Sequence, residues 1–318
     1  MKVDIIIPVY KPDKSFLQLI EKLESQTVAV NRIILMNTEE KYFLQLFYGN
    51  KFLKQYNNID VYHLSKREFN HGKTRRQGVK KSQAEIFVMM TQDAMPEDKF
   101  LLENLLKALE EEKVAAAYAR QLPAQDCNPI EKYLREFNYP DKSEIKTVED
   151  VETRGIKAYF CSDVCCAYKR TVYEELGGFV KSTIFNEDML YAAGALKAGY
   201  QIAYAAKACV VHSHNYTCME QLHRNFDLGV SQADHPEVFA EVPSESEGIK
   251  SVKATAVYLK ENRLWKWMPY LILQSGFKYI GYRLGKMYKK LPKKCVMKLT
   301  MNKEYWEQID SERENRLL

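Results

Sequence analysis

A single acidic residue, Asp93, follows a short apolar run at residues 86–90 (IFVMM). Such a run is typical of a buried parallel strand, and we expect Pro96 to end it. Ligands of open α/β sheets bind at the carboxyl ends of these strands. A carboxylate placed there suits a phosphate-bound Mg²⁺ or Mn²⁺. The same residue could instead cap a helix or a turn.

A second group of polar residues, FNHGKTRR at 69–76, has the composition of a diphosphate-binding loop. Gly72 lets the backbone approach a ligand closely. Free N–H groups at the start of the following helix favour an anion, and Lys73, Arg75 and Arg76 add positive charge. The alternative is a solvated basic helix start. The sequence has neither the GxxxxGK[ST] nor the GxGxxG spacing.

Acid–base and ligand groups also follow later in the chain. Glu187 and Asp188 stand where a helix is expected to begin. One of these carboxylates could deprotonate an acceptor hydroxyl, or both could simply complement the helix dipole. His212 and His214 alternate at a strand end and should point the same way. One of them could bind a cation, although a histidine with no ligand role is the commoner case.

The elements that must position these residues alternate between strand and helix patterns. The expected strands cover residues 3–9, 32–36, 59–64, 86–90 and 114–118. The expected helices cover residues 15–26, 41–56, 74–82 and 98–112. This alternation indicates an α/β fold with a mostly parallel central sheet and flanking helices. Right-handed crossovers bring the carboxyl ends of parallel strands to one edge, where the polar groups gather.

The second half of the chain is less regular. Residues 121–155 are polar and contain three prolines, so we expect a long irregular excursion over the active-site edge. Residues 158–168 look like a strand and residues 171–176 like a short helix. A helix over 187–198 and a strand over 200–211 should follow.

Length and composition indicate an ordinary globular protein. The 318 residues carry a net charge of +5 and are 46% hydrophobic, which suits one large domain or one domain plus an appendage. The seven cysteines form no CxxC pair, so we expect reduced thiols in a cytoplasmic protein. We expect no signal peptide and no membrane-spanning helix.

Several motifs in order resemble the inverting glycosyltransferases of family 2, which have the GT-A fold, a Rossmann-like sheet with flanking helices. They are IIIPVY, QDAMP, CCAYKRTVYEELGGF, NED and HSHNYT. The segments FNHGKTRRQGV and FDLGVSQADHP, taken with HSHNYT, are most similar to bacterial rhamnosyltransferases of that family. The resemblance implies a catalytic domain over residues 1–235 and a C-terminal basic amphipathic helical region over 236–318.

The resemblance also implies residue roles. Asp188 would be the general base, with Glu187 beside it, and Asp93 with His214 would hold Mg²⁺ or Mn²⁺. The nucleotide sugar would be bound by Pro8, Tyr10, Asn37, Glu39, Asn70, His71, Gly72, Lys73, Thr74, Arg75, Gln92 and Asp93. The sequence Gln92-Asp93-Ala94 keeps one carboxylate where many relatives have two or three.

The implied activity is transfer of L-rhamnose from dTDP-rhamnose to a glycan or lipid-linked glycan in surface polysaccharide synthesis. One alternative keeps the family but uses a UDP-hexose as donor. The other is a non-catalytic protein that binds sugar nucleotides, suggested by the single carboxylate at Asp93.

The segment from Asn262 to Asn302 contains ten lysines and arginines and no acidic residue. Aromatic and aliphatic residues are interleaved with them, which is typical of a helix at a membrane surface. We therefore expect a peripheral protein at the inner face of the cytoplasmic membrane. The alternative is a helical cap packed on the catalytic domain. Nucleic acid is not an expected partner, because no recognition motif is present.

Overall fold

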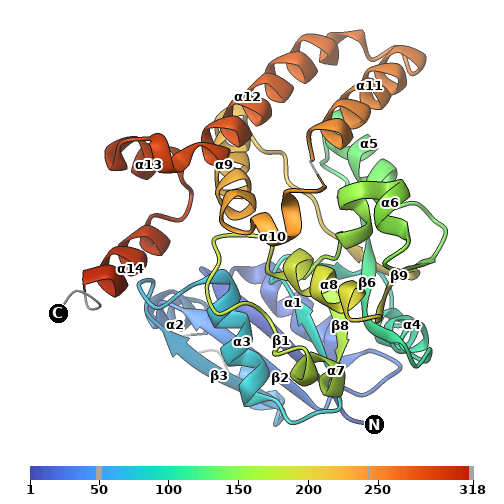
Figure 1. Cartoon of the computed structure of the whole chain (residues 1–318). Coiled ribbons are helices and arrows are strands. Elements are labelled where there is room, and N and C mark those ends of the chain that lie inside the picture. Colours follow the sequence, from blue (N-terminus) through green and yellow to red (C-terminus); the bar gives the residue numbers. More distant parts are fainter. Residues whose placement is uncertain (48–51, 243, 315–318) are drawn as a thin grey trace. The chain divides into compact units, whose positions relative to one another are not determined.

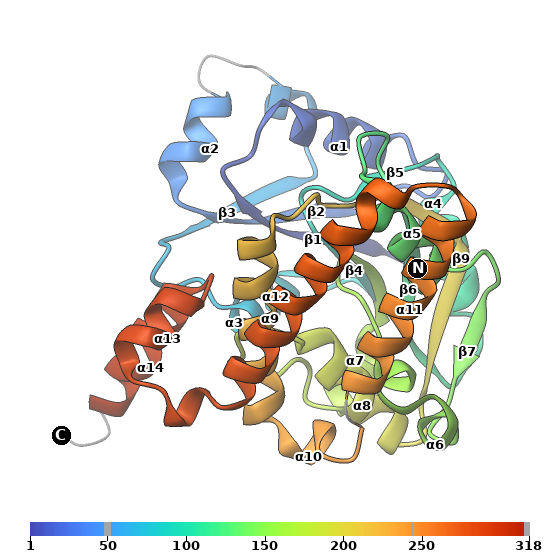
Figure 2. The same ribbon diagram turned by 90° about the horizontal axis from the view of Figure 1, so that it is seen from above.

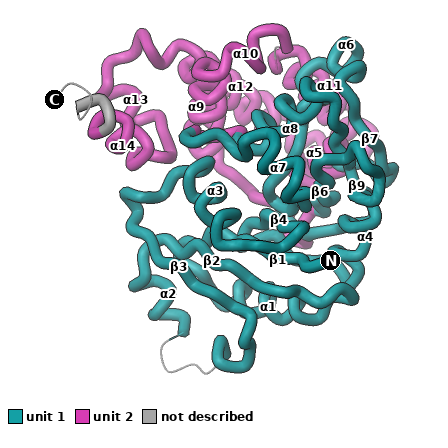
Figure 3. Tube along the Cα trace, turned by 60° about the horizontal axis from the view of Figure 1, so that its bottom comes forward, with its two compact units in different colours: residues 1–122, 139–182, 187–212 teal, residues 123–138, 183–186, 213–318 magenta. Residues whose placement is uncertain are grey.

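The computed structural model describes residues 1–47, 52–242 and 244–314. The chain forms two compact units, which Figure 3 shows in different colours. Unit 1 comprises residues 1–122, 139–182 and 187–212, and unit 2 comprises residues 123–138, 183–186 and 213–318. The expected boundary between residues 235 and 236 falls inside unit 2, after its first long helix.

Unit 1 contains a nine-stranded sheet, and the α/β class expected from the sequence is confirmed (Figure 1). The strands are β1 (Val3–Tyr10), β2 (Arg32–Thr38), β3 (Ile59–Leu64), β4 (Ile86–Met90), β5 (Met95–Pro96), β6 (Val114–Leu122), β7 (Glu144–Lys146), β8 (Cys165–Lys169) and β9 (Gln201–Val211). Their order is β3-β2-β1-β4-β8-β6-β9-β5, with β7 also paired to β9. Strands β1 to β4 pair in parallel, as do β6 and β9.

Helices cover both faces of this sheet. The helices of unit 1 are α1 (Lys14–Glu24), α2 (Glu40–Phe47), α3 (His71–Lys81), α4 (Leu101–Ala108), α6 (Asp150–Arg154), α7 (Arg170–Glu175) and α8 (Glu187–Lys197), with 3-10 turns at Phe52–Gln55 and Gly155–Tyr159. Buried side chains of α1, α2 and α4 share a core with Ile5, Ile33 and Val88. Helix α3 covers the other face, where Gly78 lies against Ile6. Successive residues of a strand point to opposite faces of the sheet. Since helices cover both faces, the residues on each face are buried, as Ile5 and Ile6 are.

The antiparallel direction of β8 places its first residues at the carboxyl end of β4. Met90, the last residue of β4, pairs with Cys165, the first residue of β8, in an antiparallel register. The Thr91 N–H donates to the Val164 carbonyl, 3.1 Å away. The stretch just before β8 therefore lies beside the carboxyl end of β4.

One expectation for the region around Asp93 needs correction. Pro96 does not end the β4 strand, because β4 already ends at Met90. Met95 and Pro96 instead form β5, which pairs with Val211 and Val210 of β9. Proline is tolerated there because β5 lies at an edge of the sheet.

The expected irregular excursion over residues 121–155 is also wrong. This stretch contains the end of β6, strand β7, helix α6 and helix α5 (Pro129–Asn138). Pro129 is the first residue of α5, a position where proline is compatible with a helix. The strand expected at 158–168 begins only at Cys165, since a 3-10 turn precedes it.

Unit 2 is helical, as expected for the C-terminal region. Besides α5 it contains α9 (Cys218–Asp234), α10 (Pro236–Phe239), α11 (Glu245–Glu261), α12 (Met268–Lys286), α13 (Lys293–Leu299) and α14 (Lys303–Glu314), with 3-10 turns at Trp265–Trp267 and Tyr288–Lys290. The basic segment is thus divided among the 19-residue helix α12, helix α13 and two 3-10 turns. Among the described helices, none combines the length and apolar character that crossing a bilayer requires.

Helices α9 and α12 lie side by side in unit 2, as Figures 1 and 2 show. Glycines make their close approach possible. A methyl group on Gly281 would lie 2.2 Å from the Leu222 carbonyl oxygen, and one on Gly285 would lie 2.1 Å from the Phe226 carbonyl oxygen. Neither backbone oxygen can move without shifting its helix, so this contact excludes any larger residue.

We therefore expect Gly281→Ala and Gly285→Ala each to lower the free energy of unfolding by about 1–3 kcal/mol, the usual cost of overpacking. Gly276→Ala on the same helix is the control, because its methyl group would meet nothing within 4 Å. Alanine is the better helix former, so this control should gain up to about 1 kcal/mol. Urea unfolding measures all three, and a similar stability for all of them would contradict the packing argument.

Candidate active site

Gln92 joins the carboxyl ends of β4 and β1. Its Nε2 donates to the Tyr10 carbonyl oxygen at 2.9 Å, and its Oε1 accepts from the Tyr10 N–H at 2.8 Å. The Tyr10 ring meets Tyr42 edge-on, with centroids 5.7 Å apart. Pro8 lies in the same strand and is partly exposed. The Gln92 amide therefore holds the backbone at this edge.

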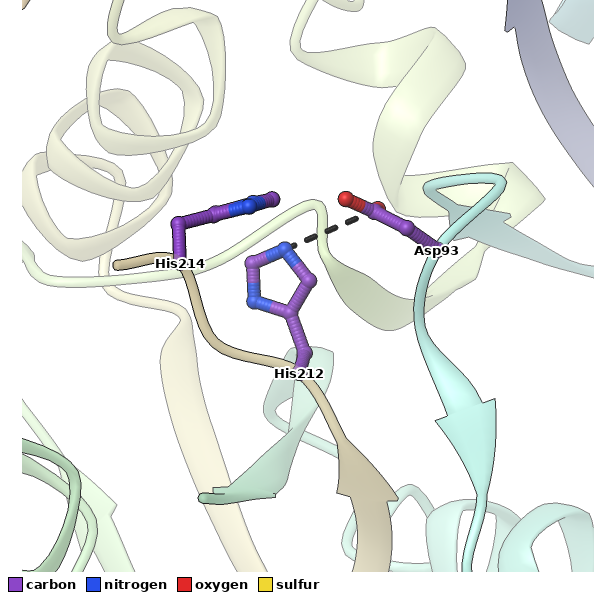
Figure 4. Close-up of side chains that lie close together, drawn as sticks. All are labelled: Asp93, His212 and His214. Atoms are coloured by element: carbon purple, nitrogen blue, oxygen red, sulfur yellow. Dashed lines mark ion pairs between the residues drawn. The ribbon is translucent and has the colours of Figure 1, made fainter. Parts of the chain in front are cut away.

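Asp93 lies close to His212, the residue that follows β9. The Asp93 Oδ1 is 3.6 Å from the His212 Nε2 (Figure 4). The His212 Nδ1 is 3.0 Å from the Gln121 Oε1. An amide oxygen only accepts hydrogen bonds, so Nδ1 carries the proton and the Nε2 lone pair faces Asp93 in the neutral imidazole.

His214 follows two residues after His212, and Figure 4 draws it with this pair. Each of the three side chains offers one ligand atom, and these atoms lie within 4.8 Å of one another. A carboxylate and two imidazoles suit a divalent transition metal such as Mn²⁺. The hydrogen bond that His212 donates to Gln121 would orient His212 as a ligand.

The residues predicted at the end of β2 are already engaged within unit 1. Asn37 is buried, and its Nδ2 lies 2.8 Å from the His63 Nδ1. Glu39 accepts a hydrogen bond from the Lys66 N–H at 2.8 Å and pairs with Lys41 at 3.3 Å. The Lys66 hydrogen bond and then Lys41 lower the pKa of Glu39.

The start of α3 is fixed by Asn70. Its side chain accepts from the Lys73 N–H at 3.1 Å, and its Nδ2 donates to the Ser182 Oγ at 2.9 Å. Thr74 is buried and accepts from the Asn70 N–H at 3.1 Å. Gly72 is buried in the first turn, whereas Lys73 is exposed. An asparagine cap of this kind sets where the helix begins.

Arg75 is buried among carboxylates. Its Nη1 lies 2.9 Å from the Glu187 Oε1, and its Nε lies 3.2 Å from the Asp163 Oδ2. The His71 Nδ1 lies 3.8 Å from the same Glu187 oxygen. One guanidinium thus joins the starts of α3 and α8 to the stretch before β8.

Asp163 and Asp188 are connected through the backbone. The Asp163 N–H donates to the Asp188 Oδ2 at 3.0 Å, and the Met189 N–H donates to the Asp188 Oδ1 at 2.7 Å. The Asp163 carboxylate accepts from the Tyr168 hydroxyl at 2.5 Å. Asp163 is fully buried, while Asp188 remains partly accessible at the first turn of α8.

This environment drives the pKa values of the adjacent acids apart. Burial and the neighbouring Glu187 raise the pKa of Asp188 to about 6. Burial would also raise the pKa of Glu187, but Arg75 and His71 outweigh it and lower that pKa to about 2. Burial raises the pKa of Asp163 well above its usual value despite Arg75. Asp188 is therefore the carboxylate suited to exchange a proton near neutral pH.

The structure adds residues for which no role was predicted. Ser162 accepts from the Gln121 Nε2 at 2.9 Å, and Gln121 in turn contacts His212. This path links the Asp93 pair to the stretch that carries Asp163. Ser162 and Asp163 are polar residues in an otherwise apolar stretch. Their position at the site depends on the antiparallel direction of β8, which no local pattern reveals.

Arg75→Gln should lower the free energy of unfolding by about 3–5 kcal/mol at pH 8, because it leaves buried carboxylates without their cation. The loss should shrink near pH 5, since Asp163 and Asp188, whose pKa values are raised, then take up protons. Lys73→Gln on the same helix makes the same charge change at an exposed position and should stay within about 0.5 kcal/mol. Urea unfolding at both pH values measures this, and an equal loss at both would contradict it.

Two known proteins match most of the chain. The chain is 36% identical over 311 residues to the O-antigen chain rhamnosyltransferase RfbN of Salmonella typhimurium, covering 97% of both chains. It is 41% identical over 255 residues to the O-antigen chain rhamnosyltransferase WbaN of Salmonella anatum, covering 80% of both.

Solved structures share the fold at low sequence identity. A mannosyltransferase of Pyrobaculum calidifontis, solved with GDP-Man and Mn²⁺, matches with a TM-score of 0.59 at 14% identity, covering 91% of this chain and 88% of its own. The S. aureus protein TarS 1-349 with UDP-GlcNAc matches with a TM-score of 0.50 at 16% identity, covering 91% and 92%. Residues 4–177 match the glycosyl transferase family 2, and the chain belongs to that family.

Proposed function

We propose that this glycosyltransferase transfers L-rhamnose from a nucleotide diphosphate donor to a glycan or lipid-linked glycan in surface polysaccharide synthesis. The observation that carries the proposal is the 36% identity, over 97% of both chains, to a protein named as an O-antigen chain rhamnosyltransferase. The match covers the helical unit as well as the sheet. If the helical unit binds the acceptor, its likeness supports a similar acceptor. Residues 1–235 would form the catalytic domain.

The proposed mechanism is a single inverting displacement with Asp188 as general base. Its carboxylate accepts the proton of the acceptor hydroxyl, the hydroxyl oxygen bonds to the anomeric carbon, and the diphosphate leaves with the electron pair of the broken bond. Two backbone N–H groups orient Asp188. Glu187 stays ionised beside Arg75, so its negative charge keeps Asp188 basic.

The donor would lie along the edge formed by the ends of β1, β2 and β4 and the start of α3. In this proposal His71, Gly72 and Lys73 face the diphosphate, and Arg75 acts from behind them through its charge. The remaining donor-binding residues would be Pro8, Tyr10, Asn37, Glu39, Asn70, Thr74, Gln92 and Asp93.

We propose that Asp93 and His214, with His212, hold Mg²⁺ or Mn²⁺. The mixed oxygen and nitrogen ligands fit such an ion, and the Gln121 hydrogen bond already fixes the His212 tautomer that a ligand needs. A cation bound there would offset the charge of the leaving diphosphate.

The donor is tested by thermal unfolding with dTDP-rhamnose, UDP-glucose, UDP-galactose and GDP-mannose, each with and without Mn²⁺. At about 100 times its Kd a ligand adds roughly 2.7 kcal/mol of stability, which raises Tm measurably. We expect the largest shift with dTDP-rhamnose and Mn²⁺. The Asp93→Asn variant should lose the Mn²⁺-dependent part of the donor-induced Tm shift and keep the Mn²⁺-independent part.

Other results of this panel would be informative. If only a UDP-sugar raised Tm, the proposed donor would be wrong, whereas the assignment as a glycosyltransferase would stand. A Mn²⁺-dependent shift that survives in Asp93→Asn would contradict the proposed metal site. No shift with any donor would contradict nucleotide-sugar binding.

Asp188→Asn should lower kcat by about 10²–10⁴-fold and leave the donor-induced Tm shift intact, because it removes only the base. Asp141→Asn, an exposed acid of the same unit, is the control and should keep full activity. In the parent protein kcat/KM should rise with pH through about 6 as Asp188 ionises. Donor binding without turnover in the parent protein itself would favour a non-catalytic binding protein.

We also propose that unit 2 contacts the inner face of the cytoplasmic membrane, with the protein otherwise cytoplasmic. Helix α12 has exposed apolar side chains at helical spacing, Ile272, Leu273, Tyr279 and Ile280. Basic residues of the acid-free segment 262–302 flank them. This combination suits an anionic lipid surface. Co-sedimentation with phosphatidylglycerol vesicles measures the contact, and full recovery of the protein in the supernatant would overturn it.

A further inference from the structure

Unit 2 contains a cluster of cations that the proposed chemistry does not use. It is organised around Tyr216, in the turn before α9. The Tyr216 carbonyl oxygen accepts from the Tyr270 hydroxyl at 3.2 Å and from the Gln274 Nε2 at 3.5 Å. The Arg224 guanidinium lies over the Tyr216 ring at 5.6 Å and over the Phe185 ring at 4.7 Å.

Lys278 belongs to the same cluster. It follows Tyr270 and Gln274 at intervals of four residues, so it lies on the same face of α12. The side chain is half-buried, and no described residue forms a hydrogen bond or ion pair with its ammonium group. A half-buried cation without a partner is costly.

The charges around Lys278 are mostly of its own sign. Burial lowers the pKa of Lys278, Glu131 raises it, and Arg224 and Arg135 lower it further. Glu131 is already engaged, because the Arg135 Nη2 and Nε lie 2.7 and 2.8 Å from its Oε1. Among the residues that the structure describes, Glu131 is therefore the one acidic group that acts on Lys278, and Arg135 already pairs with it.

We propose that Lys278 and Arg224, beside Arg135, form a binding site for a diphosphate ester. An anion with several oxygens would supply the counter-charge that Lys278 lacks, and Arg224 presents a planar fork of donors suited to phosphate. The Tyr216 and Phe185 rings would hold that guanidinium in place. That the diphosphate belongs to a lipid-linked acceptor rests on the proposed function, whereas the site itself does not.

The test is calorimetric titration of the full chain with inorganic pyrophosphate, after saturation with dTDP so that any nucleotide site is filled. We expect binding under these conditions, weakened about tenfold or more by Lys278→Gln combined with Arg224→Gln. Arg224→Gln alone should weaken pyrophosphate binding less than the double variant does. Because Arg224 is exposed, this single variant should fold normally even if the double variant does not. Lys253→Gln with Lys260→Gln makes the same charge change on exposed positions of α11 and should have no effect.

Three results would overturn the proposal. Pyrophosphate that binds only before dTDP is added would occupy the nucleotide site. Equal losses in both double variants would show a general charge effect. If Lys278→Gln with Arg224→Gln reduced binding to phosphatidylglycerol vesicles but not to pyrophosphate, the anion would be a phospholipid headgroup. Failure of the proposed function would look different, because no donor would then support turnover while pyrophosphate still bound.

Discussion

A single buried cation, Arg75, holds together three stretches that are far apart in the sequence. Its ion pairs with Glu187 and Asp163 connect the starts of α3 and α8 with the segment before β8. Buried carboxylates are tolerated only with such a partner. Burial and the charge of the adjacent Glu187, which Arg75 keeps ionised, together raise the pKa of Asp188. Packing and acid–base chemistry in unit 1 therefore depend on the same guanidinium.

Much of the sheet could be predicted from local patterns. The expected limits of the strands at residues 59–64 and 86–90 agree with β3 and β4, because apolar runs bounded by polar turns are visible in the sequence itself. The place of Asp93 beyond β4 and of Glu187 and Asp188 at a helix start followed from the same local signals. The family and its α/β fold, expected from motifs that follow one another in order along the chain, are confirmed.

Features that depend on distant pairing could not be predicted. The antiparallel direction of β8 is set by its neighbours β4 and β6, and it alone brings Asp163 to the active-site edge. The contact of His212 with Gln121 joins the residue that follows β9 to a residue of β6, far away in the chain. Likewise, residues 123–138 pack in unit 2, whose other helices lie mostly after residue 213. Sequence periodicity carries no information about such partners.

Gln92 is an amide next to the single carboxylate of Asp93, and its two hydrogen bonds to Tyr10 give this amide a structural role. An acid at this position could accept from the Tyr10 N–H but could not donate to its carbonyl. The amide adds no negative charge, but it connects the ends of β1 and β4 at the sheet edge that carries Asp93. A Gln92→Asp substitution would add a negative charge and would also remove the hydrogen bond to the Tyr10 carbonyl oxygen. The number of acids in such a motif is thus a poor guide to how well the site is organised.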